Sequence, residues 1–581
     1  MQQKHHTRLF FAAIALTAIL ISVFGSSIAF AAPASSHHAN SGGGVTVNAT
    51  RAKAASASSH SANLHNLPTI KASSKAASHK ALPVLTGLSA ATLAQRKAAA
   101  THNTHAPRAT AIAATQSSTK NGVKIGFQGM ADSATICPYF MGCAPPDMAL
   151  ATTPNYVFQG VNTSFSLYNT HGHIVAGPIN SQTFFGVPNP PNNCDPAGPF
   201  MSDPRAFYDP NDKLIWVAML QLENGAGIAP NCPEQSLYWI ANLNPTSGKM
   251  HVYSFDMTLG TTNVADFTQF GFSGQTISFS GNMFDQPGFS YLYAEAFFAD
   301  KHSMETGAPV TPVVFSQFSA SGANGQILLD TVQPVATETP LSSDPGVQYL
   351  VNSFDMNGDP FGDPFCFFSC HGYVVWQYVP SSQTISGVIV DSATPPDVYA
   401  LPPNANQPIC AGCVDTNDTR ISATPVYSVG GGSGLISFSL NTAVNNGLQT
   451  VPGILWTQIQ VLSVTSFFLG TIYQSGYLNF TADQSAFFGA MMQDKNGRIV
   501  MVFDTSSTTL NPSIMFTSRF VSDPLGFMDR PQFIIKGPSP TLNVRWGDFE
   551  AASYDGFSSN HIWVASQYSV SGDWATFIAR V

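Results

Sequence analysis

From Val123 to Val581 the apolar residues fall into short alternating runs, or short β-branched and aromatic runs, which is typical of β-strands. Examples are NYVFQGVNTSFSLYN, KLIWVAMLQLE, QTISFSGNMF, YVVWQYV and RIVMVFDTSS. Gly, Pro, Asn and Asp separate the runs, and almost no segment has the spacing of an amphipathic helix. The pattern predicts an all-β domain over residues 123–581.

The strands recur as a unit, in which an Asp is followed by a short strand, a polar or Gly turn and a longer apolar strand. The copies begin at Asp147, Asp203, Asp266, Asp418 and Asp548, with looser copies at Asp344 and Ser485. Successive copies are 56, 63, 78, 74, 67 and 63 residues apart. This even spacing predicts a β-propeller of four-stranded blades. We expect seven blades, or six if the weak copy at Asp344 is left out.

The last copy provides only three strands, FEAASY, IWVASQY and WATFIARV. An open edge would leave a row of backbone N–H and C=O groups unpaired. VKIGFQG, from Val123 to Gly129, is the one strand-like run before the first copy. We therefore expect this N-terminal strand to pair into the last blade and close the ring.

The repeated Asp residues are the first candidate site, because the first strand of each propeller blade lines the central channel. We expect these residues to gather near one mouth of that channel: Asp147, Asp203, Asp266, Asp344, Asp418 and Asp548. Carboxylates this close would repel one another. Pairing with Arg205, Arg420 and Arg545 would relieve the repulsion, as would a bound cation such as calcium. Hydrogen bonds from N–H groups at the strand starts are the arrangement that we favour.

Several segments resemble a family of secreted bacterial β-propeller-like proteins of unknown function. They are APPDMALATTPNYVFQGVN, SDPRAFYD, NDTRI, FFGAMMQDKNGRIVMVF and the terminal RWGDFEAASYD with IWVASQYS. The resemblance covers most of residues 147–581. It implies an extracellular propeller and supplies no reaction.

The first 31 residues have the composition of a secretory signal peptide. Lys4 and Arg8 precede an apolar run from Leu9 to Phe24, and Ala29-Phe30-Ala31 is the small-residue pattern of a cleavage site. The alternative is an uncleaved membrane anchor, although the run is shorter than the ~20 residues of a spanning helix. We expect cleavage and a secreted or extracellular chain, either free or at the cell envelope.

Residues 32–122 are predicted to be a disordered linker, because they are rich in Ala, Ser, Thr and His and hold almost no aromatic residues. Residues 1–122 contain 11 Lys and Arg and no Asp or Glu, whereas the rest of the chain has 13 basic and 33 acidic residues. The linker is either a solvated spacer or an adhesive tail for an anionic polymer. The acidic body argues against nucleic acid as a partner.

The eight cysteines predict disulfides in a secreted chain. We expect the local pairs Cys137 with Cys143 and Cys194 with Cys232. The other four could pair in either way. The alternative is a zinc site of four thiolates. The residues in question are Cys366, Cys370, Cys410 and Cys413.

The loop DMNGDPFGD has oxygen-bearing side chains at alternate positions, which suits a hard cation such as calcium. The candidate ligands are Asp355, Asn357 and Asp359. Glycine follows too early for a helical calcium-binding hand, and no Glu stands at the twelfth position. A solvated turn is the simpler interpretation of this weak calcium candidate.

The sequence contains no Gly-x-Ser-x-Gly, no His-Glu-x-x-His and no phosphate-binding loop. An extracellular glycoside hydrolase of sialidase-like type is the enzyme alternative, because such enzymes bind a carboxylate with clustered arginines on a propeller. No Asp-box turn of the type found in sialidases is present. We therefore expect a monomeric binding or adhesion module for a saccharide or a cell-envelope polymer, and name no catalytic residue.

Overall fold

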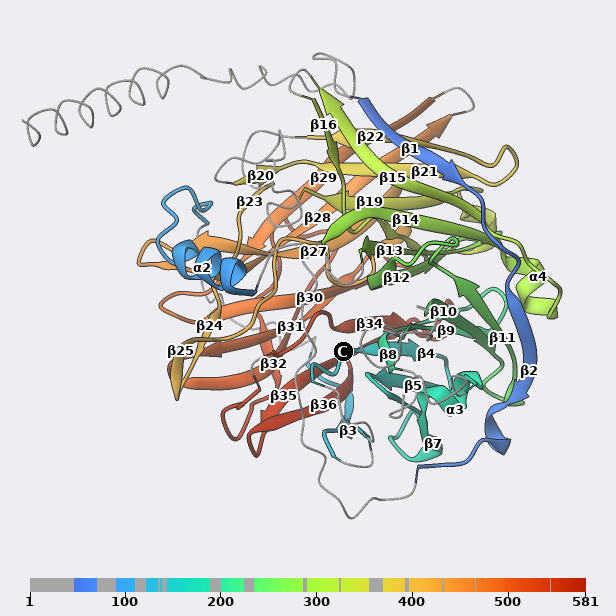
Figure 1. The fold of residues 1–581 in the computed structure, drawn as a ribbon. Helices are drawn as coiled ribbons and strands as arrows, with labels where there is room; N and C mark the ends of the chain where they lie inside the picture. Colours follow the sequence, from blue (N-terminus) through green and yellow to red (C-terminus); the bar gives the residue numbers. More distant parts are fainter. Residues whose placement is uncertain are drawn as a thin grey trace, which may run out of the picture. The chain divides into compact units, whose positions relative to one another are not determined.

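β-strands dominate the part of the chain that the computed structural model describes, as the alternating pattern predicts. The described residues are 46–70, 90–109, 122–133, 136–137, 144–188, 200–223, 235–285, 290–322, 325–354, 369–391, 397–430, 433–464, 467–543 and 545–581. Their sheets follow one another along the chain in a propeller arrangement (Figure 1). No helix in these ranges is long and apolar enough to cross a membrane.

Two antiparallel sheets consist of four strands that are consecutive in the sequence. The first contains β4 (Ala149–Thr152), β5 (Tyr156–Val161), β6 (Ser164–Asn169) and β7 (Ile174–Asn180). The second contains β30 (Ser485–Gln493), β31 (Ile499–Ser507), β32 (Leu510–Arg519) and β33 (Gln532–Ile535). A third four-stranded sheet contains β17 (Gln333–Pro334), β19 (Gln348–Ser353), β21 (Tyr373–Val379) and β22 (Thr384–Val390).

The remaining large sheets gain strands from distant parts of the sequence. One contains β8 (Phe200–Asp209), β9 (Leu214–Glu223), β10 (Gln235–Leu243), β11 (Lys249–Asp256) and the early strand β2 (Ser58–Asn63). Another contains β12 (Val264–Phe272), β13 (Thr276–Phe284), β14 (Tyr291–Asp300), β15 (Val313–Gly322), β16 (Gly325–Leu328) and β1 (Thr46–Ala52). Through β18 (Ala336–Thr337) it continues into β26 (Val426–Gly430), β27 (Ser433–Asn445), β28 (Thr450–Val464) and β29 (Phe467–Leu478).

The C-terminal sheet contains β34 (Ala551–Tyr554), β35 (Ile562–Val570), β36 (Asp573–Arg580) and β3 (Ile125–Ala131). The strand expected at Val123–Gly129 is thus β3, and it pairs antiparallel with β36, with Ile125 opposite Arg580 and Phe127 opposite Ile578. Phe127 also reaches the neighbouring sheet, where its ring lies 5.4 Å from that of Tyr168. The backbone groups of the terminal strand therefore have partners, and an aromatic contact joins the two sheets.

Short elements complete the fold. Two small two-stranded sheets pair β20 (Cys370–His371) with β23 (Val398–Tyr399) and β24 (Ala405–Gln407) with β25 (Cys410–Val414). Within the described ranges, the helical segments are η1 (Leu64–Asn66), α2 (Ala90–Ala100), α3 (Ser181–Phe185), α4 (Lys301–Thr306) and η3 (Leu341–Ser343).

Buried aromatic side chains join neighbouring sheets. The rings of Tyr238 in β10 and Phe279 in β13 are 4.9 Å apart, and those of Phe298 in β14 and Tyr378 in β21 are 3.9 Å apart. Such pairs contribute roughly 0.5–1.5 kcal/mol beyond the burial of their area. Aromatic packing between sheets therefore helps to hold successive sheets together.

Parts of the segment expected to be a disordered linker are described by the structure, and these parts form secondary structure. Within residues 32–122 the structure contains β1, β2, η1 and α2. β1 pairs with the edge of β15, and β2 pairs with the edge of β11. The side chains of β2 are mostly exposed, so backbone hydrogen bonds to open sheet edges carry this pairing. Composition could not predict it, because such bonds need no apolar side chains.

Candidate functional site

The first strands of several sheets share an unusual backbone feature. A non-glycine residue with positive φ lies in or just before five of these strands: Asp147 (φ 44°), Asp203 (φ 58°), Phe267 (φ 52°), Thr331 (φ 46°) and Phe488 (φ 55°). Asn417 (φ 53°) has the same feature in the loop between β25 and β26. In β8, β12 and β30 the pairing register shifts at this point, which marks a β-bulge. Positive φ is uncommon outside glycine, so its recurrence indicates a shared structural role.

That role is to present a backbone N–H to the preceding sheet. Three amide oxygens accept such an N–H: Asn162 Oδ1 from Asp203 (3.0 Å), Asn282 Oδ1 from Thr331 (2.7 Å) and Asn441 Oδ1 from Phe488 (2.7 Å). Each Asn lies on or just after the second strand of its own sheet. We call these three residues the asparagine clamps. The repeated Asp residues did not point to these clamps, but the segments GVNTS, SGNMF and SLNTA of the second strands share the recurring Asn.

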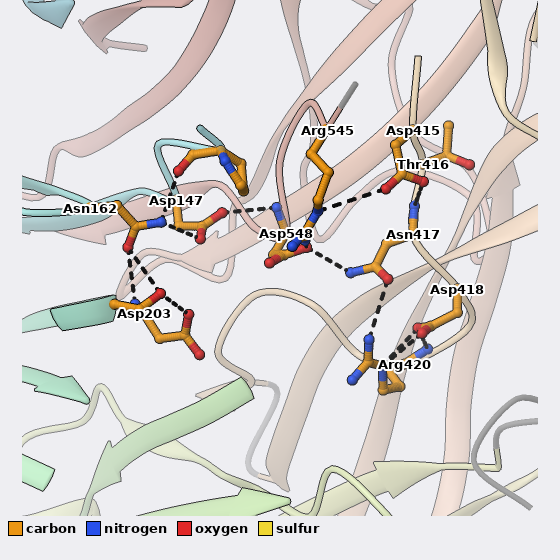
Figure 2. Close-up of polar contacts among 12 residues, drawn as sticks. Asp147, Asn162, Asp203, Asp415, Thr416, Asn417, Asp418, Arg420, Arg545 and Asp548 are labelled. Carbon is orange, nitrogen blue, oxygen red and sulfur yellow. Dashed lines mark hydrogen bonds and ion pairs between the residues drawn. The ribbon is translucent and has the colours of Figure 1, made fainter. Parts of the chain in front are cut away.

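Two of the predicted Asp residues act in the same way. Asp203 Oδ2 accepts the N–H of Thr268 at 3.0 Å, and Asp147 Oδ1 accepts the N–H of Asp548 at 2.9 Å. Asn162 connects them, because its Nδ2 donates to Asp147 Oδ2 at 2.7 Å (Figure 2). The favoured expectation, that strand-start N–H groups bind these carboxylates, describes both side chains.

Figure 2 shows the axial cluster, which we define as Asp147, Asp203, Asp415, Asp418, Asp548, Arg420, Arg545, Asn162 and Asn417. Asp548 accepts a hydrogen bond from Arg545 and another from Asn417 Nδ2 at 3.0 Å. The Nε of Arg420 lies within 2.9 Å of both carboxylate oxygens of Asp418. Most of these side chains are almost completely buried. The cluster is therefore largely satisfied from within.

Asp344 does not belong to this cluster, and its predicted place there is wrong. Its carboxylate accepts the N–H of Gly274 at 2.7 Å, in the turn after β12, whereas Asp266 lies near the start of that strand. The two residues are thus at opposite ends of β12. The first strand of the Asp344 unit is β17, which precedes Asp344, and Thr331 holds the positive-φ position before it. Aligning the repeats on their Asp residues therefore chose Asp344, whereas the structurally equivalent residue is Thr331.

The three predicted arginines are engaged within the protein. Arg545 pairs with Asp548 and lies 4.0 Å from Asp415. Arg420 pairs with Asp418, and its guanidinium lies 4.2 Å from the centre of the Phe267 ring. Arg205 stacks on Phe549 at 3.3 Å and donates to the carbonyl of Ser422. Each of the three guanidinium groups therefore has partners within the protein.

Burial dominates the electrostatics of the cluster. It raises the pKa of Asp147 well above its ordinary value, and the charges of Asp548 and Asp203 raise it further. Burial and the nearby Asp203 and Asp548 raise the pKa of Asp266 to about 8. Burial alone would lower the pKa of Arg545, but Asp548 and Asp415 raise it. Several of these carboxyl groups therefore favour their neutral form, which relieves the repulsion expected among them.

A second candidate site is a cavity of about 380 Å³ between the turn after α2 and the β27–β28 hairpin. Neutral amide and hydroxyl side chains contribute to its lining: Asn103, Asn404, Asn406, Asn445, Gln449, Thr101, Thr104 and Thr450. Asn404 Oδ1 is buried and has no hydrogen-bond partner among the described residues. A buried acceptor without a donor costs roughly 1–3 kcal/mol, so a ligand N–H or O–H would be favourable there.

The cysteines among the described residues are all disulfide-bonded. Cys410 and Cys413 form a disulfide, which overturns the zinc alternative because their thiolates are no longer free to bind a metal. Cys137 and Cys370 are also disulfide-bonded. The predicted partners Cys143, Cys194, Cys232 and Cys366 lie outside the described residues. Disulfides are typical of proteins in an oxidising, extracellular setting.

The calcium hypotheses stay predictions. The loop with Asp355, Asn357 and Asp359 lies outside the described residues, as does the expected signal peptide. Among residues that the structure describes, no group of three or more His, Cys, Asp or Glu is arranged to hold a metal ion.

No family model matches this chain, and no curated protein matches it. Solved structures that resemble it include a protein of unknown function from Dyadobacter fermentans, at 10% identity over 55% of this chain and 94% of that one (TM-score 0.26). A sialidase of Trypanosoma rangeli is 6% identical over 65% of this chain and 54% of its own length (TM-score 0.30). A Penicillium chrysogenum α-L-arabinanase is 10% identical over 55% and 93% (TM-score 0.27). Similarity at these scores carries no information on activity.

Proposed function

We propose that the chain is a secreted or cell-surface binding module that takes a saccharide or a cell-envelope polymer in the 380 Å³ cavity. The observation that carries the proposal is the unpartnered Oδ1 of Asn404 in a wall of neutral amides and hydroxyls. Sugar hydroxyls are neutral and can both donate and accept, so they match this wall. The volume lies within the usual range of ligand sites, ~300–1,000 Å³.

The scaffold in this proposal is a propeller of seven blades that β3 closes. Supporting it are the seven groups of successive antiparallel strands that begin with β4, β8, β12, β17, β26, β30 and β34, of which the β12 and β26 groups are joined through β18. The pairing of β3 with β36 supports the closure. A closed ring would hold the segments around the cavity at fixed positions, and rigid positioning lowers the entropy lost on binding.

The test is a glycan array probed with the full secreted chain, followed by titration of the best ligand. Asn404→Ala removes the unpartnered acceptor, and we expect affinity to fall roughly threefold to tenfold, as for one lost hydrogen bond. Asn155→Ala, at an exposed position outside the cavity, is the matched control and should bind like the wild type. Equal affinity of all three proteins would contradict the proposed site.

The alternative is a glycoside hydrolase of sialidase-like type. Its supporting observation is that Arg420 and Arg545 both lie in the axial cluster. Arg205 is close enough to interact electrostatically with Asp203 and Asp147. Their engagement with internal partners argues for a structural role. A panel of glycosidase substrates run beside the array separates the two ideas, because turnover of a sialoside would favour the enzyme.

A further inference from the structure

Helix α2 places a lysine inside the protein. The side chain of Lys97 is only 4% exposed, whereas most residues around it in the helix are alanines or exposed polar residues. Its Nζ donates to Asp415 Oδ1 at 3.2 Å, to Thr416 Oγ1 at 3.2 Å and to the carbonyl oxygen of Asn417. An ammonium group has three N–H donors, so these three acceptors meet all of its hydrogen-bonding capacity.

The acceptors belong to the body of the protein and are fixed independently of α2. Asn417 has positive φ, and its side chain donates to Asp548 Oδ1 at 3.0 Å. Thr416 Oγ1 also donates to the carbonyl of Pro403 at 2.8 Å. Asp415 Oδ1 accepts the N–H of Asn417 at 3.1 Å. The three oxygens are thus held in place by hydrogen bonds that do not involve Lys97.

Charge balance favours a cation at this position. Arg420 pairs with Asp418, and Arg545 pairs with Asp548 and is 4.0 Å from Asp415, so Lys97, at 3.2 Å, is the nearest cation to Asp415. Burial alone would raise the pKa of Asp415, but Lys97 and Arg545 hold it below its ordinary value. Asp415 is therefore ionised near neutral pH, and Lys97 supplies the nearest positive charge.

We propose that Asp415, Thr416 and Asn417 form a binding site for a primary ammonium group, and that Lys97 fills it as a ligand supplied by the chain itself. The site selects an alkylammonium over a quaternary ammonium, because only the former has N–H donors. It is distinct from the cavity of the proposed function and does not depend on saccharide binding. A tethered ligand acts at an effective concentration of about millimolar, so an external amine must compete with α2.

The test removes the internal ligand and supplies an external one. Thermal melts are recorded for the full chain and for Lys97→Ala, each with n-butylammonium chloride, tetramethylammonium chloride at equal ionic strength, or n-butanol. We expect Lys97→Ala to melt several degrees lower than the wild type. Only n-butylammonium should restore part of this loss, and it should leave the wild type unchanged. An equal response of both proteins, or equal rescue by tetramethylammonium, would overturn the proposal.

The double variant Lys97→Ala, Asp415→Asn is the matched control, and n-butylammonium should not stabilise it. If Lys97→Ala does not fold, it is refolded with increasing n-butylammonium. Recovery of the folded state supports the site, and failure to recover at every concentration overturns it. Lys97→Met, which keeps most of the stem and removes the charge, shows whether lost packing explains the effect.

Discussion

At the scale of single residues, the asparagine clamps explain how several acidic side chains are accommodated in one buried cluster. Asn162 is fully buried, accepts the N–H of Asp203 and donates to both Asp147 and the carbonyl of Pro145. One neutral side chain thereby serves groups from two neighbouring sheets. A carboxylate at this position would add repulsion, and an aliphatic residue would leave several buried groups unpaired.

Asn162→Ala should lower the free energy of unfolding by about 2–5 kcal/mol, because it leaves at least two buried polar groups without partners. Urea unfolding curves measure the change. Asn155→Ala, at an exposed position, should stay within about 0.5 kcal/mol of the wild type. If the two variants are equally stable, the clamp is not what joins these sheets.

The sequence could reveal the recurring acidic residues but not which backbone position they share. The structural requirement is a positive φ with an N–H aimed at the preceding sheet, and Asp203, Thr331 and Phe488 all meet it. Because side chains as different as these fill one backbone role, an alignment on Asp fails at Asp344. The buried contacts of Lys97 were equally hidden, since no local pattern around Lys97 identifies a partner at Asp415.

At the scale of elements, the strands of the body followed from alternation and turn residues, and so did the late pairing of β3 with β36. The early strands β1 and β2 did not, because their residues are polar and their partners are the backbones of β15 and β11. These strands cover two sheet edges that would otherwise be open to other chains. The N-terminal segment is therefore part of the fold where it is described.

Two N-terminal deletions separate the contributions of these elements. Deletion through Lys120 removes β1, β2 and α2, and should lower the melting midpoint while unfolding stays cooperative. Deletion through Ala131 also removes β3, which leaves the edge of β36 unpaired and loses the contact of Phe127 with Tyr168. We expect its cooperative transition to collapse. Calorimetry measures the melting of both deletion variants. Identical melting curves would show that β3 does not close the last sheet.

At the scale of the whole molecule, buried carboxyl groups make stability depend on pH. Burial is the first cause that raises the pKa of Asp132 and Asp266 to about 8, and of Glu305 and Asp504 to about 7. Glu295 has no exposed surface, its oxygens have no hydrogen-bond partner among the described residues, and burial raises its pKa well above the ordinary value. The folded state therefore holds protons that the unfolded chain releases near pH 4.

The direction of this pH dependence follows from the linkage between proton binding and folding. A carboxyl group with a raised folded pKa stabilises the fold fully below its unfolded pKa, and this contribution is lost as pH rises through the folded pKa. The window runs from about pH 4 to pH 8 for the four carboxyl groups whose pKa is raised to about 7 or about 8. The carboxyls with lowered pKa, Asp212, Asp415 and Asp483, titrate below this window. Burial lowers the pKa of His60, so this residue binds its proton more weakly in the folded state. It therefore makes stability rise with pH, but by no more than one proton's worth.

We therefore expect the free energy of unfolding to be larger at pH 5 than at pH 8, by at least roughly 2 kcal/mol, since each extra bound proton contributes about 1.4 kcal/mol per pH unit. Urea unfolding at intervals between these values measures the slope. Glu295→Gln mimics the protonated side chain, so it should match the wild type at pH 5, exceed it in stability at pH 8 and flatten the slope. A wild-type stability that is constant or rises from pH 5 to pH 8 would mean that the buried carboxyls stay ionised in the fold. In that case the axial cluster would need a cation to balance it, and the calcium hypothesis would gain from the same measurement.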